Sequence, residues 1–108
     1  MLMSNDGRGL GIEKVSGNRR LEVRVAGVVQ GVGFRWFVSR HAREMNLSGW
    51  VRNLPGAGVE VVAEGPQEDL ERLLLLVQSG PRSARVSDSE VSWAKPEGLK
   101  GPFDIKGW

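Results

Sequence analysis

Alternation of apolar and polar residues predicts the first strand of this chain. In LEVRVAG, residues 21 to 27, apolar residues alternate with Glu22 and Arg24, which is the period of a half-buried β-strand. Two further strand candidates are SGWVRNL, residues 48 to 54, and VEVVAEG, residues 59 to 65. The intervening PGAG favours a turn because it contains a proline and two glycines. These two segments therefore predict a hairpin.

Apolar residues recur at helical spacing in two other segments. The first predicted helix runs from about Phe34 to Asn46, because apolar residues recur there at spacings of four, four and three. The second lies between Pro66, which a first helical position tolerates, and Gly80. Its first turns carry acidic residues, and its apolar face consists of Leu70, Leu73, Leu74 and Val77.

The end of the chain completes the order of elements. A last main strand is predicted between Ala84 and Trp93, although Val86 and Val91 have opposite parity, so a bulge or a late start must absorb the slip. The terminal PFDIKGW could add a short strand. The resulting order, βαββαβ, predicts an α+β fold in which two helices cover one face of a four-stranded antiparallel sheet.

Composition limits the domain organisation and the class of partner. The 108 residues suffice for one core, which we place in residues 21 to 108. Residues 1 to 20 are rich in glycine, serine, asparagine and charge, so we expect a flexible N-terminal extension. A net charge of +2 does not suggest nucleic-acid binding. Without a membrane span or a secretory h-region, we expect a cytoplasmic monomer that binds no membrane.

The absence of cysteine excludes a group of chemistries. Disulfides, thiolate nucleophiles and cysteine-containing metal sites all require a residue that this chain lacks. The lone histidine, His41, lies six residues after Arg35 on the same predicted helix, nearly on its opposite side. We therefore expect His41 to be structural or solvent-facing.

The glycine-rich loop VVQGVGFR, residues 28 to 35, lies between the first strand and the first helix. In this arrangement, unpaired N–H groups at a helix start can converge on an anion. The loop matches neither G-x-x-x-x-G-K-[ST] nor G-x-G-x-x-G, so nucleotide binding loses its main support. Arg35 lies in the first helical turn, where the helix dipole disfavours a cation unless an anion lies between them. On chemistry alone, a phosphate cradle and a structural turn remain equally open.

Several motifs together resemble the acylphosphatase family. They are GVVQGVGFR at 27 to 35, GWVRN at 49 to 53, VEVVAEGP at 59 to 66, and GP-x-x-ARV at 80 to 86. The resemblance extends from about residue 21 to the C-terminus. It implies a ferredoxin-like α/β sandwich whose four main strands have the order 4-1-3-2. It also implies hydrolysis of the carboxyl–phosphate bond of acyl phosphates, which gives a carboxylate and inorganic phosphate.

The resemblance further implies roles for particular residues. Arg35 would hold the phosphate and Asn53 would orient the attacking water. Backbone amides of the loop would assist Arg35; they belong to Gln30, Gly31, Val32, Gly33 and Phe34. A guanidinium and fixed N–H dipoles can stabilise phosphoryl transfer by positioning and electrostatics. Because the leaving group is good, we expect no metal and no cofactor, and we hypothesise that the substrate's own phosphate accepts the proton.

Other functions compete with this interpretation. A non-catalytic anion-binding or regulatory module could share the fold, although binding alone would not require Asn53. An RNA-recognition domain would carry stacking aromatics on its two middle strands, and LEVRVAG and VEVVAEG contain none. The acylphosphatase-like region of larger hydrogenase-maturation carbamoyltransferases is a third alternative, but its expected zinc motifs need cysteines that are absent here.

Three charged residues and one serine complete the sequence-based expectations. Arg52 alternates to the strand face opposite Asn53, so we expect a solvated charge. Glu60 and Glu64 have no partner that the sequence identifies, and acid–base roles for them are improbable. Ser89 occupies a position of the last main strand where an apolar residue is expected.

Overall fold

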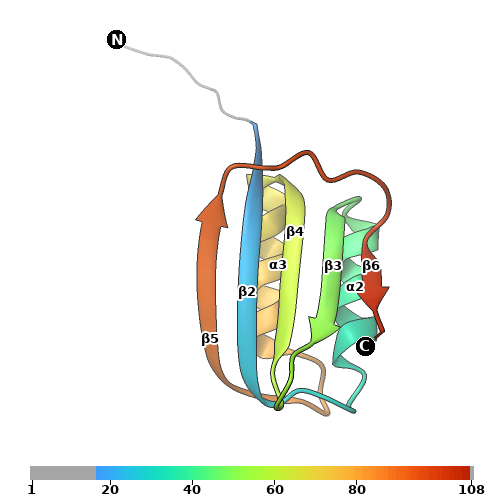
Figure 1. Ribbon diagram of the computed structural model, residues 1–108, viewed down its shortest axis with the longest axis vertical. Helices are drawn as coiled ribbons and strands as arrows, with labels where there is room; N and C mark the ends of the chain where they lie inside the picture. The colour runs from blue at the N-terminus through green and yellow to red at the C-terminus, as the bar shows by residue number, and fades with distance from the viewer. Residues whose placement is uncertain (1–16, 108) are drawn as a thin grey trace.

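A computed structural model describes residues 17–107 of the chain. Its strands are β2 (Asn18–Val28), β3 (Ser48–Asn53), β4 (Val59–Pro66), β5 (Arg85–Ala94) and β6 (Asp104–Lys106). Its helices are α2 (Phe34–Glu44) and α3 (Gln67–Ser79). The strands form one sheet in the order β5-β2-β4-β3-β6, and both helices lie behind it (Figure 1). The predicted α+β fold is confirmed.

The four main strands have the predicted order. Numbered along the chain, β5, β2, β4 and β3 are strands 4, 1, 3 and 2, and each adjacent pair is antiparallel. The suggested terminal strand also forms, as β6, and pairs parallel to β3. The sheet therefore has five strands and is mixed, whereas the expected main sheet had four antiparallel strands. This addition matters for function because β6 lies beside the strand that ends at Asn53.

Several element ends differ from those predicted. Strand β2 begins at Asn18, three residues before position 21, because residues 18 to 20 continue the pairing with β4. The rest of the predicted extension, residues 1–16, lies outside the described residues, as does Trp108. Helix α2 ends at Glu44 rather than Asn46, whose φ of 57° is left-handed. Pro66 is not the first helical residue: its ψ of 139° is extended, and α3 begins one residue later.

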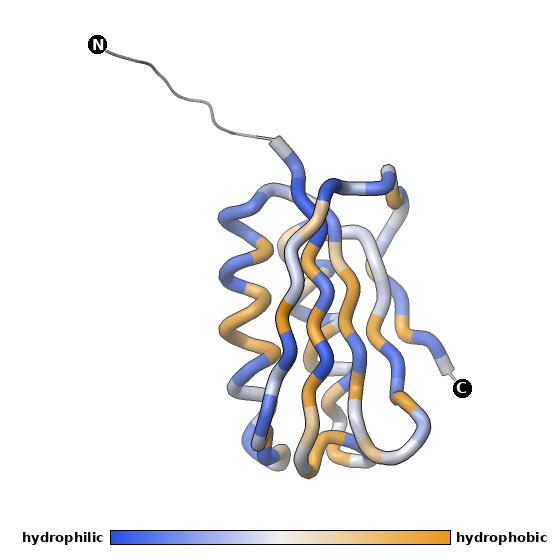
Figure 2. Tube along the Cα trace, turned by 60° about the vertical axis from the view of Figure 1, so that its left-hand side comes forward, coloured by the Kyte–Doolittle hydropathy of each residue, from blue (hydrophilic) through white to orange (hydrophobic). Residues whose placement is uncertain are grey.

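One apolar core lies between the sheet and the helices. Alternate residues of β2 point toward the helices, and Figure 2 shows the matching alternation of hydrophobic and hydrophilic residues along the strands. Leu21, Val23 and Val25 pair across to Ala63, Val61 and Val59 of β4, and all six are buried. They pack against the buried faces of α2 and α3. Burying one such branched side chain completely stabilises the fold by about 1.5–3 kcal/mol.

The parity slip in the last main strand is absorbed by a β-bulge, as predicted. Ala26 pairs with Asp88 but Gly27 pairs with Val86, so Ser87 is an additional residue on β5. Gly27 has a φ of 127°, and a Cβ at this position would lie 2.0 Å from the carbonyl oxygen of Arg85. Only glycine therefore fits where the two strands change register.

Ser89 departs from the apolar pattern of β5 but has a polar partner. The side-chain amide of Gln78, on α3, donates a hydrogen bond of 3.1 Å to Ser89 Oγ. This bond satisfies the hydroxyl under the edge of α3. A serine is therefore accommodated on the helix-facing side of the sheet.

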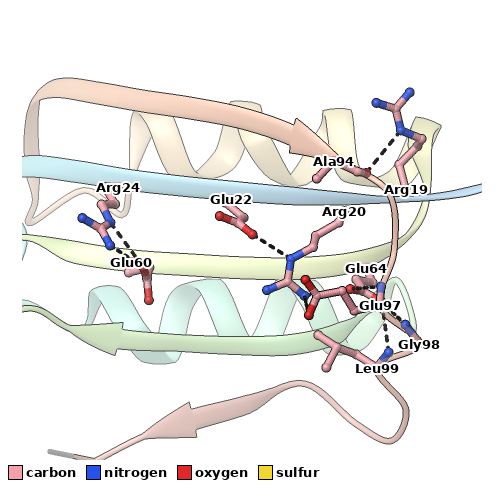
Figure 3. Close-up of polar contacts among 10 residues, drawn as sticks. All are labelled: Arg19, Arg20, Glu22, Arg24, Glu60, Glu64, Ala94, Glu97, Gly98 and Leu99. Carbon is pink, nitrogen blue, oxygen red and sulfur yellow. Dashed lines mark hydrogen bonds and ion pairs between the residues drawn. The ribbon is translucent and has the colours of Figure 1, made fainter.

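The sheet face without helices carries paired charges. Glu60 accepts hydrogen bonds from Arg24 (3.2 Å) and Arg52 (2.7 Å), and Glu64 accepts one from Arg20 (2.8 Å). Figure 3 shows the Arg24–Glu60 and Arg20–Glu64 contacts. Both carboxylates thus have the partners that the sequence did not reveal. Arg52 lies on the face opposite Asn53 as expected, but it is an ion-pair partner rather than a freely solvated charge.

Glu64 also holds the linker that leads to β6. Its carboxylate accepts hydrogen bonds from the backbone N–H groups of Glu97, Gly98 and Leu99 at 2.8, 3.1 and 3.0 Å (Figure 3). Burial raises the pKa of Glu64, but these hydrogen bonds and Arg20 outweigh burial and hold the pKa below its ordinary value. One buried carboxylate therefore anchors the segment that carries β6 across the sheet to β3.

Candidate active site

The glycine-rich loop between β2 and α2 has a backbone conformation that depends on its glycines. Gly31 and Gly33 have φ values of 74° and 78°, a left-handed conformation that favours glycine. A Cβ at either position would meet nothing within 4 Å, so the backbone conformation, rather than crowding by other residues, explains the two glycines. Gly33 precedes the first residue of α2, whose initial N–H groups have no partner within the helix. Backbone donors without a partner in the helix therefore lie where this loop meets α2.

Arg35 lies in the first turn of α2, beside these donors. Its Nη1 donates a hydrogen bond of 2.9 Å to the carbonyl oxygen of Lys106, on β6. A guanidinium carries five N–H donors, so this contact orients the group and leaves further donors for an anion. The C-terminal strand thus contributes to the position of Arg35, although the two residues are 71 positions apart in the chain.

Asn53 is the last residue of β3, and its side-chain oxygen is buried without a partner. Alternation along β3 places Asn53 on the same side as buried Val51, facing the helices. Its Oδ1 has no hydrogen-bond partner among residues 17–107. Burying such an acceptor unsatisfied costs about 1–3 kcal/mol. A polar atom in this condition is a strong candidate for contact with a ligand or a bound water.

The side chain of Gln30 connects the loop to the β3–β4 hairpin. Its Nε2 donates hydrogen bonds of 2.9 Å to the carbonyl oxygen of Leu54 and 2.8 Å to that of Gly58. Leu54 N–H also donates to Gly58 at 2.8 Å, so the hairpin turn is itself closed. This double contact holds the end of β3, and therefore Asn53, next to the loop. The sequence suggested a role only for the backbone amide of Gln30.

Arg35, Asn53 and part of the loop lie on the walls of one cleft of about 190 Å³. It is lined by Val29, Gly31, Gly33, Phe34, Arg35, Trp36, Asn53 and Ile105. Five of the seven predicted site residues therefore line the same cleft. The other two lie in the loop behind it: Gln30 reaches the hairpin, and the carbonyl of Val32 accepts a hydrogen bond of 2.8 Å from Ser83 Oγ.

Three lining residues were not predicted as site residues from the sequence: the buried Val29 and the exposed Trp36 and Ile105. Trp36 follows Arg35 directly, and Ile105 lies on β6. The exposed position of Trp36 on its helix was a possible signal, because it falls outside the predicted apolar stripe. For Ile105 there was no local signal, since its position depends on the parallel pairing of β6 with β3.

Other candidate chemistries gain no support from the described part of the chain. His41 does not line the cleft; its ring packs edge-on against Phe37 and lies 3.5 Å from Glu44. Within residues 17–107, no group of three or more histidine, aspartate and glutamate side chains could hold a metal ion. No helix in that range is long and apolar enough to cross a membrane.

Comparison with known proteins gives one consistent result. The family model for acylphosphatase matches residues 21–105. The chain is 52% identical over 88 residues to an acylphosphatase of Thermococcus kodakarensis, covering 82% of this chain and 96% of that relative. It is 54% identical over 82 residues to one of Thermus thermophilus, covering 76% and 93%. The crystal structure of Bacillus subtilis acylphosphatase has a TM-score of 0.78 and 37% identity, covering 82% of this chain and 99% of that one.

Proposed function

Since this chain belongs to the acylphosphatase family, whose activity is hydrolysis of the carboxyl–phosphate bond of acyl phosphates, we propose that Arg35 holds the substrate's phosphate and Asn53 orients the attacking water. The chain is a hydrolase of this class, which releases a carboxylate and inorganic phosphate. A non-catalytic module of the same fold is not favoured, because relatives at 52% and 54% identity are acylphosphatases.

The phosphate is held by charge and by fixed dipoles. The guanidinium of Arg35 and the backbone amides of residues 30–34 act together at the N-terminus of α2, where the helix dipole also favours an anion. The hydrogen bond from Arg35 to Lys106 orients the guanidinium in advance of binding. Negative charge on the phosphoryl oxygens in the transition state meets the same donors, so the barrier falls without a covalent intermediate.

The buried and unpartnered Oδ1 of Asn53 supports this proposal most directly. The residue Asn53 lines the same cleft as Arg35, and its Oδ1 has the capacity to accept a hydrogen bond from one water. The water's lone pair is then directed at the phosphorus held by Arg35. As the new P–O bond forms, the bond from phosphorus to the acyl oxygen breaks, and the carboxylate leaves with the electron pair.

The proton of the attacking water goes to a phosphate oxygen of the substrate. An amide such as Asn53 is not a base at neutral pH, and His41 lies outside the cleft. A carboxylate is a good leaving group, so strong general acid or metal assistance is less necessary than for a phosphate monoester. We therefore propose turnover without a metal or a cofactor.

We propose a cytoplasmic enzyme for small molecules, and the remaining surfaces support its action as a monomer. The arginines on the open sheet face already pair with Glu60 and Glu64, which leaves that face poorly suited to nucleic acid or anionic membranes. The edge strand β5 carries charged residues such as Asp88 and Glu90, which disfavour pairing with a second chain.

Turnover of benzoyl phosphate in the presence of a chelator tests the proposal. The comparison uses the wild-type chain, Asn53→Ala and a control, Asn18→Ala, which alters an exposed asparagine at the start of β2. We expect metal-free hydrolysis that Asn18→Ala keeps and Asn53→Ala loses by about a hundredfold or more. Full turnover in Asn53→Ala would show that the water is oriented by another group.

A further inference from the structure

The cleft has a further wall besides Arg35 and the loop residues assigned to the phosphate, and this wall is apolar. Among the described residues, the large hydrophobic side chains exposed to solvent are Val28, Trp36, Leu75, Val91 and Ile105. Trp36 and Ile105 both line the cleft, with 63% and 36% of their surface exposed. Exposing an indole and a branched aliphatic side chain is unfavourable in water, so their position beside Arg35 suggests contact with a ligand.

A contact outside the cleft orients the ring of Trp36, and strand pairing fixes the backbone of Ile105. The guanidinium of Arg40 lies 5.2 Å from the centroid of the Trp36 ring, one turn further along α2, and does not line the cleft. Arg40 is in turn 3.7 Å from Glu44. Ile105 pairs with Val51 in the parallel β3–β6 ladder, two residues before Asn53. The apolar wall is therefore preorganised by α2 and β6.

The basic residues near the cleft favour a neutral acyl group over an anionic one. Arg35 is the only basic residue that lines the cleft among residues 17–107. The ammonium of Lys106 lies 4.9 Å from the ring of Trp50, and Arg52 pairs with Glu60 on the open face of the sheet. A second negative charge on the acyl group would therefore find no counter-ion in the cleft, and it would have to lose hydration against Trp36 and Ile105.

We propose that Trp36 and Ile105 form a subsite for the acyl group, so that acyl phosphates with an apolar, in particular aromatic, acyl group are preferred to those with a small or anionic one. This inference rests on the proposed function, since it assumes that Arg35 and the loop take the phosphate. The acyl group then leaves the loop toward the part of the cleft where an aromatic ring can pack on Trp36. Trp36 is a specificity-determining residue in this arrangement.

The ratio of kcat/KM for benzoyl phosphate to kcat/KM for acetyl phosphate tests the inference. The wild-type chain should favour benzoyl phosphate by about tenfold or more, and Trp36→Ala should lower that ratio by about fivefold to tenfold. Trp36→Phe should retain most of the preference, because it restores an aromatic surface. The matched control, Leu75→Ala, removes a hydrophobic residue that is 68% exposed on α3, away from the cleft, and should keep the wild-type ratio.

A binding measurement separates failure of the subsite from failure of the proposed reaction. Titration with phenylphosphonate and methylphosphonate requires no turnover, and Trp36→Ala should weaken phenylphosphonate binding about fivefold more than methylphosphonate binding. Hydrolysis with the same benzoyl-to-acetyl ratio in wild type and Trp36→Ala would overturn the subsite alone. If the folded wild-type chain hydrolysed neither substrate but kept the phenyl preference, the reaction would be refuted and the subsite supported. The subsite would be refuted if phenylphosphonate and methylphosphonate bound with equal affinity to the wild-type chain and if Trp36→Ala left both affinities unchanged.

Discussion

The side-chain amide of Gln30 donates a hydrogen bond of 2.9 Å to the carbonyl oxygen of Leu54, the residue that follows Asn53. A second bond of 2.8 Å from the same nitrogen reaches Gly58 across the hairpin turn. The anion loop and the end of β3 are thereby joined by one side chain. Arg35 and Asn53, 18 residues apart in the sequence, are held on the walls of one cleft.

Removing this link should impair catalysis more than phosphate binding. In Gln30→Ala the loop amides and Arg35 remain, but Asn53 loses its fixed position, so we expect kcat to fall by about tenfold. The half-buried carbonyls of Leu54 and Gly58 also lose this donor, and only Gly58 keeps another, from Leu54 N–H, so the free energy of unfolding should fall by about 1 kcal/mol. Steady-state kinetics, inhibition by inorganic phosphate and urea denaturation measure these effects.

The matched control for this variant is Gln67→Ala. Gln67 is exposed on α3 and bonds only to Glu71 among the contacts described, at 3.1 Å. It should retain wild-type kcat and stability. A Gln30→Ala protein with wild-type kcat would show that the link does not position Asn53.

Substitutions of Arg35 and of Asn53 should differ in their effects on phosphate affinity and on kcat. Arg35→Ala should weaken inhibition by inorganic phosphate and reduce kcat by about a hundredfold or more, because it removes charge that faces the phosphate in both the ground and transition states. Asn53→Ala should reduce kcat while inhibition by phosphate is largely kept. The control Arg85→Ala, an exposed arginine on β5, should change neither quantity. Equal losses of phosphate affinity in Arg35→Ala and Asn53→Ala would contradict the assigned roles.

Stability should decrease in acid because of the two buried carboxylates on the open sheet face. Burial raises the pKa of Glu60, but Arg52 and Arg24 outweigh it and lower that pKa, and the pKa of Glu64 is lowered too. The unfolded chain therefore binds protons at higher pH than the folded chain does. Their contribution is fully present above the ordinary glutamate pKa of about 4.5 and is lost as pH falls through the lowered folded values.

Urea denaturation between pH 7 and pH 3 measures this effect. Glu64→Gln should be less stable than wild type at pH 7, and its stability should depend less steeply on pH below the ordinary glutamate pKa. Glu68→Gln, an exposed substitution on α3, should reproduce the wild-type profile. A Glu64→Gln profile parallel to that of wild type would show that Glu64 contributes nothing to the acid transition.

Gly27 should tolerate no side chain. A Cβ would lie 2.0 Å from the carbonyl oxygen of Arg85, and the φ of 127° is rarely adopted by other residues. We expect Gly27→Ala to lower the free energy of unfolding by at least about 2 kcal/mol. Gly17→Ala is the control, because a Cβ there meets nothing within 4 Å and should be nearly neutral. Thermal denaturation of the two variants distinguishes them, and equal melting temperatures would show that the strands shift freely at the bulge.

Much of this fold could be predicted because its signals are local. The alternation around Leu21 and the helical spacing from Phe34 depend only on which neighbours a residue must face. Even the bulge followed from the opposite parity of Val86 and Val91. The ends of elements were less predictable. Arg20 is buried because it pairs with Glu64 on the neighbouring strand. The local hydrophobic pattern does not identify such a charged residue as part of a strand.

The sequence by itself determined the order of elements, the glycines that allow the loop's positive φ values, and the two residues proposed for phosphate and water. Only the tertiary structure decided how these parts meet. It brings Gln30 to the hairpin, Lys106 to Arg35, and Trp36 and Ile105 to the same cleft. The reason is that periodicity specifies which face of an element is buried, whereas contacts between distant segments depend on strand pairing and on the anchored linker at Glu64.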